Sequence, residues 1–406
     1  FEELIRKFNE ENNEEAGEHF TPREVIDLMT HILFMPVQEQ LPPVITIYDP
    51  ACGSGGMLTE SQDFITNPEG QIQAKSDVYL YGKEINDETY AICKSDMMIK
   101  GNNPEHIKCG STLASDDFAG MRFDFMLSNP PYGKSWAGDQ KHILDGKQVL
   151  DHRFEVTLAN YRGKLETVSA TPRSSDGQLL FLMEMVSKMK DLGKGPAGSR
   201  IASVHNGSSL FTGDAGGGES NIRRHIIEND LLEAIIQLPN NLFYNTGITT
   251  YIWVLSNKKA EPRRGKVQLI DASQKFQKLR KNLGAKNCEF TPEHIREITQ
   301  LYLDMPHSGC SKLFDNSDFG YYKVTIERPS RRAAQFTPER IASLRFVPAL
   351  REVMEWAYER WGGDIYTRLM EHRKAIEAHL EKEEINLSAK QNKVLLDPAT
   401  WTSQKT

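Results

Sequence analysis

Apolar and polar positions in the first third of the chain follow a pattern typical of alternating strands and helices. Val44 to Tyr48 is a run of β-branched and aromatic residues, and apolar positions resume with helical spacing from Met57. Asp77 to Tyr81 and Phe123 to Leu127 are two further runs with the character of buried strands. This alternation predicts an α/β fold whose sheet is mostly parallel and whose helices cross over between strands.

The later part of the chain continues the strand pattern and then changes. Leu231 to Leu238 and Thr249 to Leu255 have strand composition, and Val267 to Ile270 adds another strand. Residues 133–175 are polar and lack a clear period, which predicts a long loop. After about Ala285 helical patterns dominate, so we expect a mostly helical region to follow the α/β part.

Glycines cluster where the first strand ends. Asp49 closes the strand, and Gly53, Ser54, Gly55 and Gly56 lead into the next helix. Glycines at such a turn let the backbone approach a ligand closely. The spacing is not G-x-G-x-x-G, and no Lys-Ser/Thr pair follows as in a phosphate loop. A cofactor without a pyrophosphate is therefore favoured, with Asp49 placed to bind a cationic amino group.

An acidic residue, Glu84, stands at the end of the second strand. Acidic residues at this position commonly bind ribose hydroxyls. Glu84 would serve NAD and S-adenosylmethionine equally well, and a solvated surface carboxylate is the plain alternative.

The tetrad Asn129-Pro130-Pro131-Tyr132 follows the strand that ends near Leu127. Two consecutive prolines fix φ at two positions and remove two backbone donors. The Asn129 side-chain oxygen and the Pro130 carbonyl could then both accept hydrogen bonds from one amino group. Tyr132 would supply a flat face, so the tetrad suits a nucleobase that is taken out of its stack. An ordinary strand-to-loop exit is the alternative reading of these residues.

Taken in this order, the motifs resemble those of amino-directed DNA methyltransferases that use S-adenosylmethionine. The similarity is greatest to the modification (M) subunit of type I restriction-modification systems. It covers roughly residues 1–335 and is carried by Glu18 to Arg23, Asp49 to Gly56, Asn129 to Tyr132, Glu219 to Arg224, Leu238 to Ile248 and Ile252 to Leu255.

The resemblance implies a Rossmann-like methyltransferase fold, with an antiparallel hairpin at the end of the mostly parallel sheet. It implies methyl transfer to N6 of adenine in DNA, with Asn129, Pro130, Pro131 and Tyr132 as the catalytic loop and no metal. Expected cofactor-binding residues are Glu18, His19, Phe20, Thr21, Pro22, Arg23, Asp49, Gly53, Ser54, Gly55, Gly56, Glu84 and Ser111.

One position departs from the family pattern, which has an Asp that contacts the adenine ring of the cofactor after the third strand. Here that position is Ser111, which can form a hydrogen bond but carries no charge. A catalytically silent scaffold therefore stays open as an alternative. An N4-cytosine enzyme, a solitary DNA methyltransferase and a protein glutamine methyltransferase are further alternatives.

The resemblance also suggests a domain organisation and partners. We expect residues 1–17 to be the remnant of an N-terminal helical region, 18–285 the methyltransferase catalytic domain, and 286–406 a mostly helical C-terminal region suited to partner docking. Thr21 would cap a helix that starts near Pro22. Expected partners are double-stranded DNA and a specificity (S) subunit, with a restriction (R) subunit and a second M subunit as further candidates.

Composition agrees with a dependence on partners. The chain has 49 Lys and Arg against 56 Asp and Glu, a net charge of −7, whereas a protein that binds DNA alone usually has a basic excess. Local basic clusters exist, and we interpret each as a solvated charge cluster rather than as a phosphate contact; they are Arg223-Arg224, Arg263-Arg264, Lys278 to Lys281 and Arg331-Arg332.

Cysteine usage and hydropathy bear on the compartment. Five cysteines are scattered without C-x-x-C spacing, which fits a reducing cytosol and argues against a zinc site or a disulfide framework. No stretch of about 18 apolar residues is present, so we expect no membrane span and a cytoplasmic location.

Overall fold

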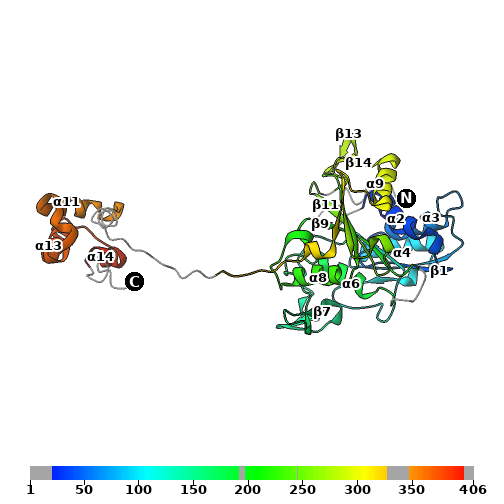
Figure 1. The fold of residues 1–406 in the computed structure, drawn as a ribbon, viewed down its shortest axis with the longest axis horizontal. Helices are drawn as coiled ribbons and strands as arrows, with labels where there is room; N and C mark the ends of the chain where they lie inside the picture. The colour runs from blue at the N-terminus through cyan, green and yellow to red at the C-terminus, as the bar shows by residue number, and fades with distance from the viewer. Residues whose placement is uncertain (1–20, 192–196, 245, 327–346, 397–406) are drawn as a thin grey trace. The chain divides into compact units, whose positions relative to one another are not determined.

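A nine-stranded mixed sheet forms the centre of the first of two structural units, Phe1–Lys323 and Val324–Thr406 (Figure 1). The computed structural model describes residues 21–191, 197–244, 246–326 and 347–396. Residues 1–17 and the expected cofactor-contacting Glu18, His19 and Phe20 lie outside this described part.

The sheet is mostly parallel, as expected, and has further strands beyond the antiparallel hairpin. The strands, in spatial order, are β15 (Ser311–Asp315), β12 (Lys266–Asp271), β10 (Leu232–Gln237), β11 (Thr250–Ser256), β9 (Arg200–Asn206), β4 (Phe125–Ser128), β1 (Val44–Asp49), β2 (Asp77–Glu84) and β3 (Ile107–Cys109). The run from β3 to β9 is parallel, and β11 is antiparallel to both β9 and β10. Beyond this hairpin, β12 pairs in parallel with β10, and β15 closes the edge antiparallel to β12.

Alternating side chains of the strands form a core on each face of the sheet. Ile47 of β1 and Leu127 of β4 contribute to one apolar cluster, whereas Tyr48 and Met126, one position away, contribute to the other. This is the two-residue period of a strand that is buried on both faces. The position of the sheet between two helical layers follows from this pattern.

Helices from distant parts of the chain cover the two faces. Residues of α2 (Arg23–Phe34), α3 (Gly56–Thr66), α4 (Asp87–Ile99) and α9 (Pro292–Asp304) share the first cluster. The second cluster contains residues of α6 (Gln178–Ser187) and α8 (Gly218–Glu228). Short helices α5 (Gln140–Ile143) and α7 (Ser208–Phe211) complete the described helices of this unit.

The stretch expected to be one long loop is largely structured. It contains two small hairpins, β5 (Leu144–Asp145) with β6 (Gln148–Val149), and β7 (Glu155–Ala159) with β8 (Leu165–Ser169). Val156 and Leu158 of β7 are buried, so these strands pack on the second cluster. The expectation of an irregular loop was therefore wrong.

The first unit continues past the boundary that we expected after residue 285. That boundary falls in the turn of a hairpin formed by β13 (Gln277–Leu283) and β14 (Lys286–Glu289). Downstream, α9 packs against α2 and β15 joins the central sheet, so the unit extends to Lys323.

The second unit is helical, as the sequence pattern indicated. Its described helices are α11 (Arg351–Trp361), α12 (Ile365–Arg368), α13 (Arg373–Lys382) and α14 (Ala389–Leu396). They enclose a small core of their own that includes Val353, Met354, Leu369 and Ile376. Across the described part of the chain, every helix is too short or too polar to span a lipid bilayer.

Candidate active site

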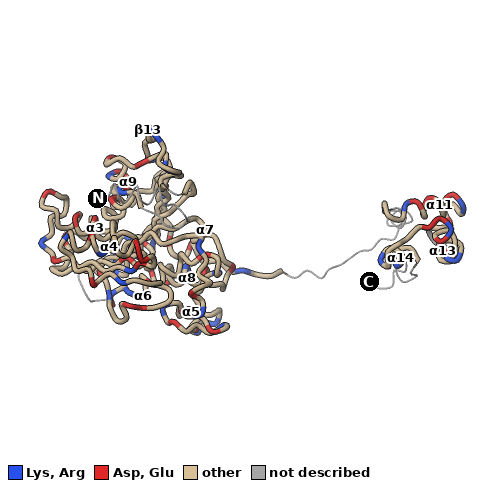
Figure 2. Tube along the Cα trace, turned by 180° about the vertical axis from the view of Figure 1, so that it is seen from behind, with Lys and Arg blue, Asp and Glu red and all other residues tan. Residues whose placement is uncertain are grey.

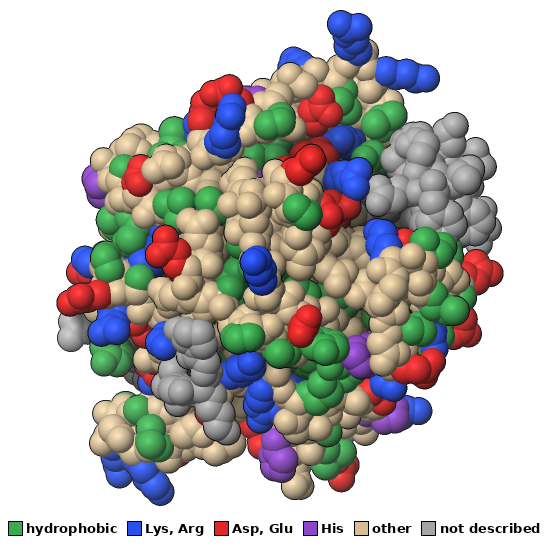
Figure 3. All heavy atoms as spheres, turned by 90° about the vertical axis from the view of Figure 1, so that its right-hand side faces the viewer, with side chains coloured by type: hydrophobic (Ala, Val, Ile, Leu, Met, Phe, Trp, Pro, Cys, Tyr) green, Lys and Arg blue, Asp and Glu red, His purple; other side chains and the backbone are tan. Residues whose placement is uncertain are grey.

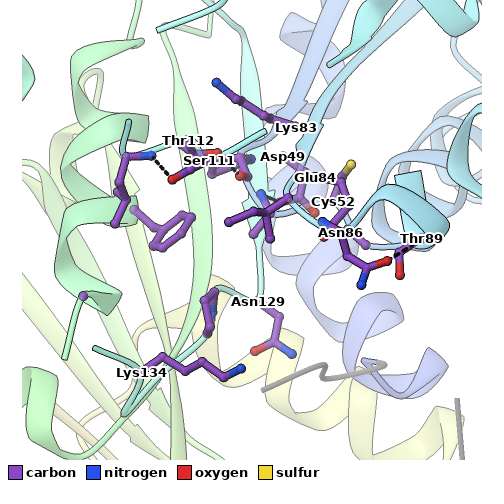
Figure 4. A pocket seen from close by; sticks show the side chains of 18 of the residues that line it. Asp49, Cys52, Lys83, Glu84, Asn86, Thr89, Ser111, Thr112, Asn129 and Lys134 are labelled. Atoms are coloured by element: carbon purple, nitrogen blue, oxygen red, sulfur yellow. Dashed lines mark hydrogen bonds between the residues drawn. The ribbon is translucent and has the colours of Figure 1, made fainter. Parts of the chain in front are cut away.

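A cavity of about 340 Å³ lies at the carboxyl ends of β1, β2 and β4 (Figure 4). Ligands of open α/β sheets bind at this edge, where the loops after the strands converge. The cavity brings together most of the residues that the sequence singled out, which are Thr21, Asp49, Gly53, Ser54, Gly56, Glu84, Ser111, Asn129 and Pro131.

The glycine loop between β1 and α3 has the backbone that its glycines permit. Gly53 and Gly55 adopt φ values of +53° and +87°, in the left-handed region that side chains disfavour. A Cβ on Gly55 would lie 2.8 Å from the sulfur of Cys93, so close packing against α4 excludes a side chain there. A Cβ on Gly53 would meet no other residue within 4 Å, so the space beside this backbone is open to the cavity that Gly53 lines.

Glu84 at the end of β2 supports this loop. Its Oε2 accepts a hydrogen bond of 2.9 Å from the Gly53 backbone N–H, and its Oε1 accepts one of 2.8 Å from Asn86. A carboxylate has about four acceptor positions, so Glu84 can still accept from the hydroxyls of a ligand. The surface-carboxylate alternative does not fit, because Glu84 lines the cavity and organises it.

Asp49 is buried beneath the loop, with only 1% of its surface exposed. Its Oδ1 accepts hydrogen bonds from the Ala51 N–H at 2.9 Å and from the Ser128 hydroxyl at 2.8 Å. Burial raises the pKa of this carboxyl to about 7, and the nearby charge of Glu84 adds to the rise. A cation placed next to Asp49 would restore the ionised form, so the site is suited to an ammonium group.

Asn129 carries the most specific feature of the cavity. Its Nδ2 donates to the Thr21 hydroxyl at 3.0 Å, which fixes the orientation of the amide. Its Oδ1 is buried and accepts no hydrogen bond from any residue that the structure describes. A buried acceptor without a donor is costly, so this oxygen is prepared for a donor that arrives with a ligand.

The residues after Asn129 differ in their placement. Pro131 lines the cavity and Pro130 is buried behind it. Tyr132, which we expected to stack on a base, is 6% exposed and packs in the first apolar cluster. Burial raises the pKa of the Tyr132 hydroxyl well above its usual range. In this conformation the aromatic residues that line the cavity are Trp136 and Phe181.

A buried polar network holds the far end of the catalytic loop. Asp176 accepts a hydrogen bond of 3.1 Å from the Gly133 N–H through Oδ1, and the Lys134 carbonyl accepts one of 3.0 Å from Gly177. The other Asp176 oxygen accepts from Gln178 at 2.7 Å and from the Ser208 hydroxyl at 2.6 Å. The loop is thus fixed at both ends, by Thr21 and by this network.

The segment before α2 contributes in part. Thr21 lines the cavity, whereas Pro22 is the N-terminal capping residue of α2 and does not line it. The cap expected at Thr21 is therefore displaced by one residue, and the Thr21 hydroxyl binds Asn129 instead. Arg23 is exposed and bonds to Glu60 at 2.7 Å, so the structure does not bring it to the cavity.

Ser111 lies after β3 at the edge of the cavity. Its hydroxyl oxygen accepts weak hydrogen bonds from the backbone N–H groups of Leu113 and Ala114, at 3.2 and 3.3 Å. The hydroxyl hydrogen can still be donated to a ligand. Ser111 therefore lacks the charge of the Asp expected at this position. Its hydroxyl stabilises the turn and can still donate one hydrogen bond.

Several lining residues were missed by sequence reasoning. They are Ile85, which is 66% exposed, Lys134, Trp136 and Phe181, together with the buried Lys83, which donates to Ser115. Trp136 lies in the stretch that we expected to be a loop, and Phe181 lies in α6. Only their place after the catalytic loop could have signalled them. Within the described residues, no group of three or more His, Cys, Asp or Glu is arranged to hold a metal ion.

The sheet order, the glycine loop, the two acidic strand ends and the Asn-Pro-Pro-Tyr loop together define the fold of S-adenosylmethionine-dependent methyltransferases. A family model described as N-6 DNA Methylase matches residues 1–328, and the chain belongs to that family. Two similar proteins are methylase subunits of type I restriction enzymes. The MjaIX methylase subunit of Methanocaldococcus jannaschii is 26% identical over 347 residues, which are 85% of this chain and 55% of that protein. The HindI subunit of Haemophilus influenzae is 28% identical, covering 68% and 53% respectively.

Solved structures agree with this assignment. The type I restriction-modification methyltransferase subunit from Streptococcus thermophilus superimposes with a TM-score of 0.59 at 26% identity, over 78% of this chain and 59% of that one. A modification subunit of a putative type I enzyme from Vibrio vulnificus, 17% identical, shares the fold with a TM-score of 0.56 over 79% and 60%. The chain spans about half the length of the curated relatives that it matches.

Proposed function

We propose that this chain is the methyltransferase part of a type I modification subunit, which transfers a methyl group from S-adenosylmethionine to N6 of adenine in double-stranded DNA. The observation that carries the proposal is the buried Asn129 Oδ1, which accepts no hydrogen bond within the described structure and belongs to a residue that lines the cavity. Membership of the N-6 DNA methylase family supports the choice of adenine N6.

The cavity fits S-adenosylmethionine by its chemistry. Asp49, buried and with a raised pKa, would hold the cationic amino group of the methionine part. The glycine loop offers backbone instead of side chains, and Glu84 would accept from the ribose hydroxyls. Ser111 would donate to the adenine end. The bound cofactor supplies a methyl group on a positively charged sulfur, which needs no metal for its transfer.

The catalytic loop would bind the target amino group. The lone pair of an adenine amino nitrogen is shared with the ring, so this nitrogen is a poor nucleophile. Asn129 Oδ1 and the Pro130 carbonyl would accept its two N–H bonds and hold the nitrogen in position, and positioning supplies much of such catalysis. The base must leave its stack to reach this point. Pro131, Trp136 and Phe181 would provide its apolar surroundings, with Tyr132 joining them only if the loop rearranges.

Partners complete the proposed assembly. We infer that target recognition comes from a specificity subunit, with a restriction subunit and a second M subunit in the larger complex. A structure described as showing assembly of a type I system shares this fold with a TM-score of 0.55 at 20% identity. The helical unit after Lys323 is a candidate docking region for such partners.

The test is methyl transfer by the chain together with the specificity subunit encoded beside it. Asn129→Ala should lower the rate of transfer by at least about a hundredfold, because the transition state loses an acceptor for the amino group. Binding of S-adenosylmethionine, measured by calorimetry, should change less than threefold, because Asn129 serves the target. Activity of the variant within tenfold of the wild type would refute the role of Asn129.

Two alternatives are separated by the same assay. Mass analysis of the nucleosides in the product identifies N6-methyladenine or N4-methylcytosine directly. A silent scaffold would bind the specificity subunit and DNA without producing either nucleoside, even when S-adenosylmethionine binds.

A further inference from the structure

The β13–β14 hairpin presents three cations on an otherwise acidic chain. Lys278, Arg280 and Lys281 lie on β13, all three are exposed, and none forms an ion pair with another described residue. The pairing register shifts between Lys278 and Leu283, so β13 carries extra residues that bulge out of the ladder. Arg280 and Lys281 belong to this bulge. We call these three side chains the basic hairpin cluster.

The hairpin rises from the edge of the sheet that holds the cavity. β12 runs parallel to β10, and β10 runs in the same direction as β9 and β4, because β11 is antiparallel to both of its neighbours. The carboxyl end of β12, which leads into β13, therefore lies at the same edge as Asn129 at the end of β4. Figure 2 shows basic residues at this hairpin. In Figure 3, cationic side chains project at the top of the molecule, and Figure 1 shows β13 at the same height.

Contacts at the base of the hairpin connect it to the cavity wall. Lys286 of β14 is buried and forms an ion pair with Glu24 in the first turn of α2. Thr21, one turn before Glu24, accepts the hydrogen bond from Asn129. The turn of the hairpin is tied to the loop after β10, because the Ala285 N–H donates to the Tyr244 carbonyl at 2.8 Å. The hairpin that carries the cluster is thus anchored through Lys286 and Glu24 to the start of α2, the segment whose Thr21 binds Asn129.

We propose that the basic hairpin cluster binds the phosphate backbone of double-stranded DNA whose target base occupies the cavity. The inference rests on the proposed function, since it takes duplex DNA to be the substrate. A flipped base remains attached to its duplex, so the duplex has to lie across the edge of the sheet where the cavity opens. Exposed Lys and Arg side chains at that edge would then contact the phosphate groups of the duplex, which carry its negative charge. This replaces our interpretation of Lys278 to Lys281 as a merely solvated cluster.

The three cations of the cluster matter more for DNA binding in this acidic chain than they would in a chain with a basic net charge. With a net charge of −7, the chain has no general attraction for DNA, and local cations must overcome that repulsion. The fourth cation of the hairpin, Lys286, is neutralised by Glu24 and serves as an anchor. The one carboxylate of the hairpin, Glu289, accepts a hydrogen bond from Gln277 at 2.7 Å. Three exposed cations that form no ion pair with a described residue suit backbone contacts, which position the duplex without reading its sequence.

The experiment compares two triple variants of the same charge. The test variant is Lys278→Gln, Arg280→Gln and Lys281→Gln. The control is Lys75→Gln, Arg122→Gln and Arg264→Gln, three exposed cations that precede β2, β4 and β12 and so lie at the opposite edge of the sheet. Binding to a short fluorescent duplex is measured by anisotropy between about 50 and 200 mM salt, with S-adenosylmethionine affinity as a check on folding.

We expect the test variant to bind the duplex at least tenfold more weakly than the wild type at the lowest salt. The slope of log affinity against log salt should fall by up to about 2.7, roughly 0.9 for each lost phosphate contact. The control should keep the wild-type slope. Equal losses in both variants, or no measurable duplex binding by the wild type, would overturn the proposal.

Failure of the proposed function is distinguishable from failure of this inference. If the hairpin variant alone loses duplex binding but the wild type produces no methylated nucleoside, the DNA surface stands and the enzymatic assignment fails. If methyl transfer occurs and its KM for DNA is the same in the test variant and the control, the inference fails and the enzymatic assignment stands.

Discussion

The proposed binding of S-adenosylmethionine next to Asp49 predicts an affinity that depends on pH, because the pKa of this carboxyl is raised. Burial raises the pKa of this carboxyl from 3.8 to about 7 in the ligand-free protein. The reference pKa of an α-amino group at a chain terminus is about 7.8, and we take this value for the amino group of the cofactor. Binding pairs an ionised Asp49 carboxylate with a protonated amino group. The affinity should therefore be greatest at a pH between the two pKa values, near pH 7.4.

The size of the effect follows from the two pKa values. At pH 6 only about a tenth of the protein carries an ionised Asp49, so the dissociation constant should be about sixfold higher than at pH 7.4. In Asp49→Asn the affinity should be about ten- to a hundredfold lower, because a charge-assisted hydrogen bond is lost. The variant should show no weakening between pH 7.4 and pH 6, since the remaining amino group only gains its proton, and with it the binding-competent charge, as the pH falls.

Calorimetric titration at several pH values provides the measurement. Repeating it in two buffers of different ionisation enthalpy also counts the protons released on binding, which should approach one at pH 6 in the wild type and vanish in Asp49→Asn. A wild-type dissociation constant that is unchanged from pH 6 to 7.4 would contradict the reasoning. So would a variant that retains the loss of affinity at acidic pH.

The same carboxyl links pH to the stability of the ligand-free protein. Because the pKa of Asp49 is higher in the folded state than in the unfolded chain, folding takes up a proton between about pH 4 and 7. The free energy of unfolding should therefore fall as the pH rises through that window, by up to about 4 kcal/mol from this group. The difference between the wild type and Asp49→Asn in chemical denaturation isolates this contribution.

Three further predictions concern other parts of the unit. Gly55→Ala should lower the free energy of unfolding by about 2–4 kcal/mol in denaturant titrations, because a Cβ at φ +87° meets Cys93 Sγ at 2.8 Å; an unchanged midpoint would contradict the close packing. Glu233→Gln should cost about 3–5 kcal/mol, since it leaves the buried Arg200, 2.8 Å from the Glu233 carboxylate, without its counter-ion; a loss below 1 kcal/mol would argue against that pairing. Asp176→Asn should lower kcat for methyl transfer about ten- to a hundredfold with an unchanged cofactor dissociation constant, because Asp176 holds the catalytic loop at Gly133; a rise in the cofactor constant alone would contradict this.

The positions of the strands were the most predictable part of the fold. β1, β2 and β4 are short apolar runs bounded by turn residues, and their positions agree with the runs from Val44, Asp77 and Phe123. Local composition indicates such strands because both of their faces are buried. The β7–β8 hairpin escaped prediction because one of its faces is polar and only Val156 and Leu158 mark the buried side.

Long-range contacts limited the prediction of the site. Residues that follow parallel strands had to meet at one edge, so the meeting of Asp49, Glu84 and Asn129 could be anticipated. The hydrogen bond of Thr21 with Asn129 joins residues 108 positions apart, and no local pattern signals it. Tyr132 shows the opposite failure, since an aromatic residue in a catalytic loop suggests stacking while the surrounding apolar cluster decides its position.

The bond between Thr21 and Asn129 has a consequence for the order of events in a catalytic cycle. Thr21 belongs to the wall of the cavity, and through its hydroxyl it sets the orientation of the amide that would receive the target. A ligand that moves Thr21 would therefore change the affinity for the target, and the target would change the affinity for that ligand by the same factor. Exchange of spent for fresh cofactor and release of the modified base would then be coupled events, communicated by a single hydroxyl group.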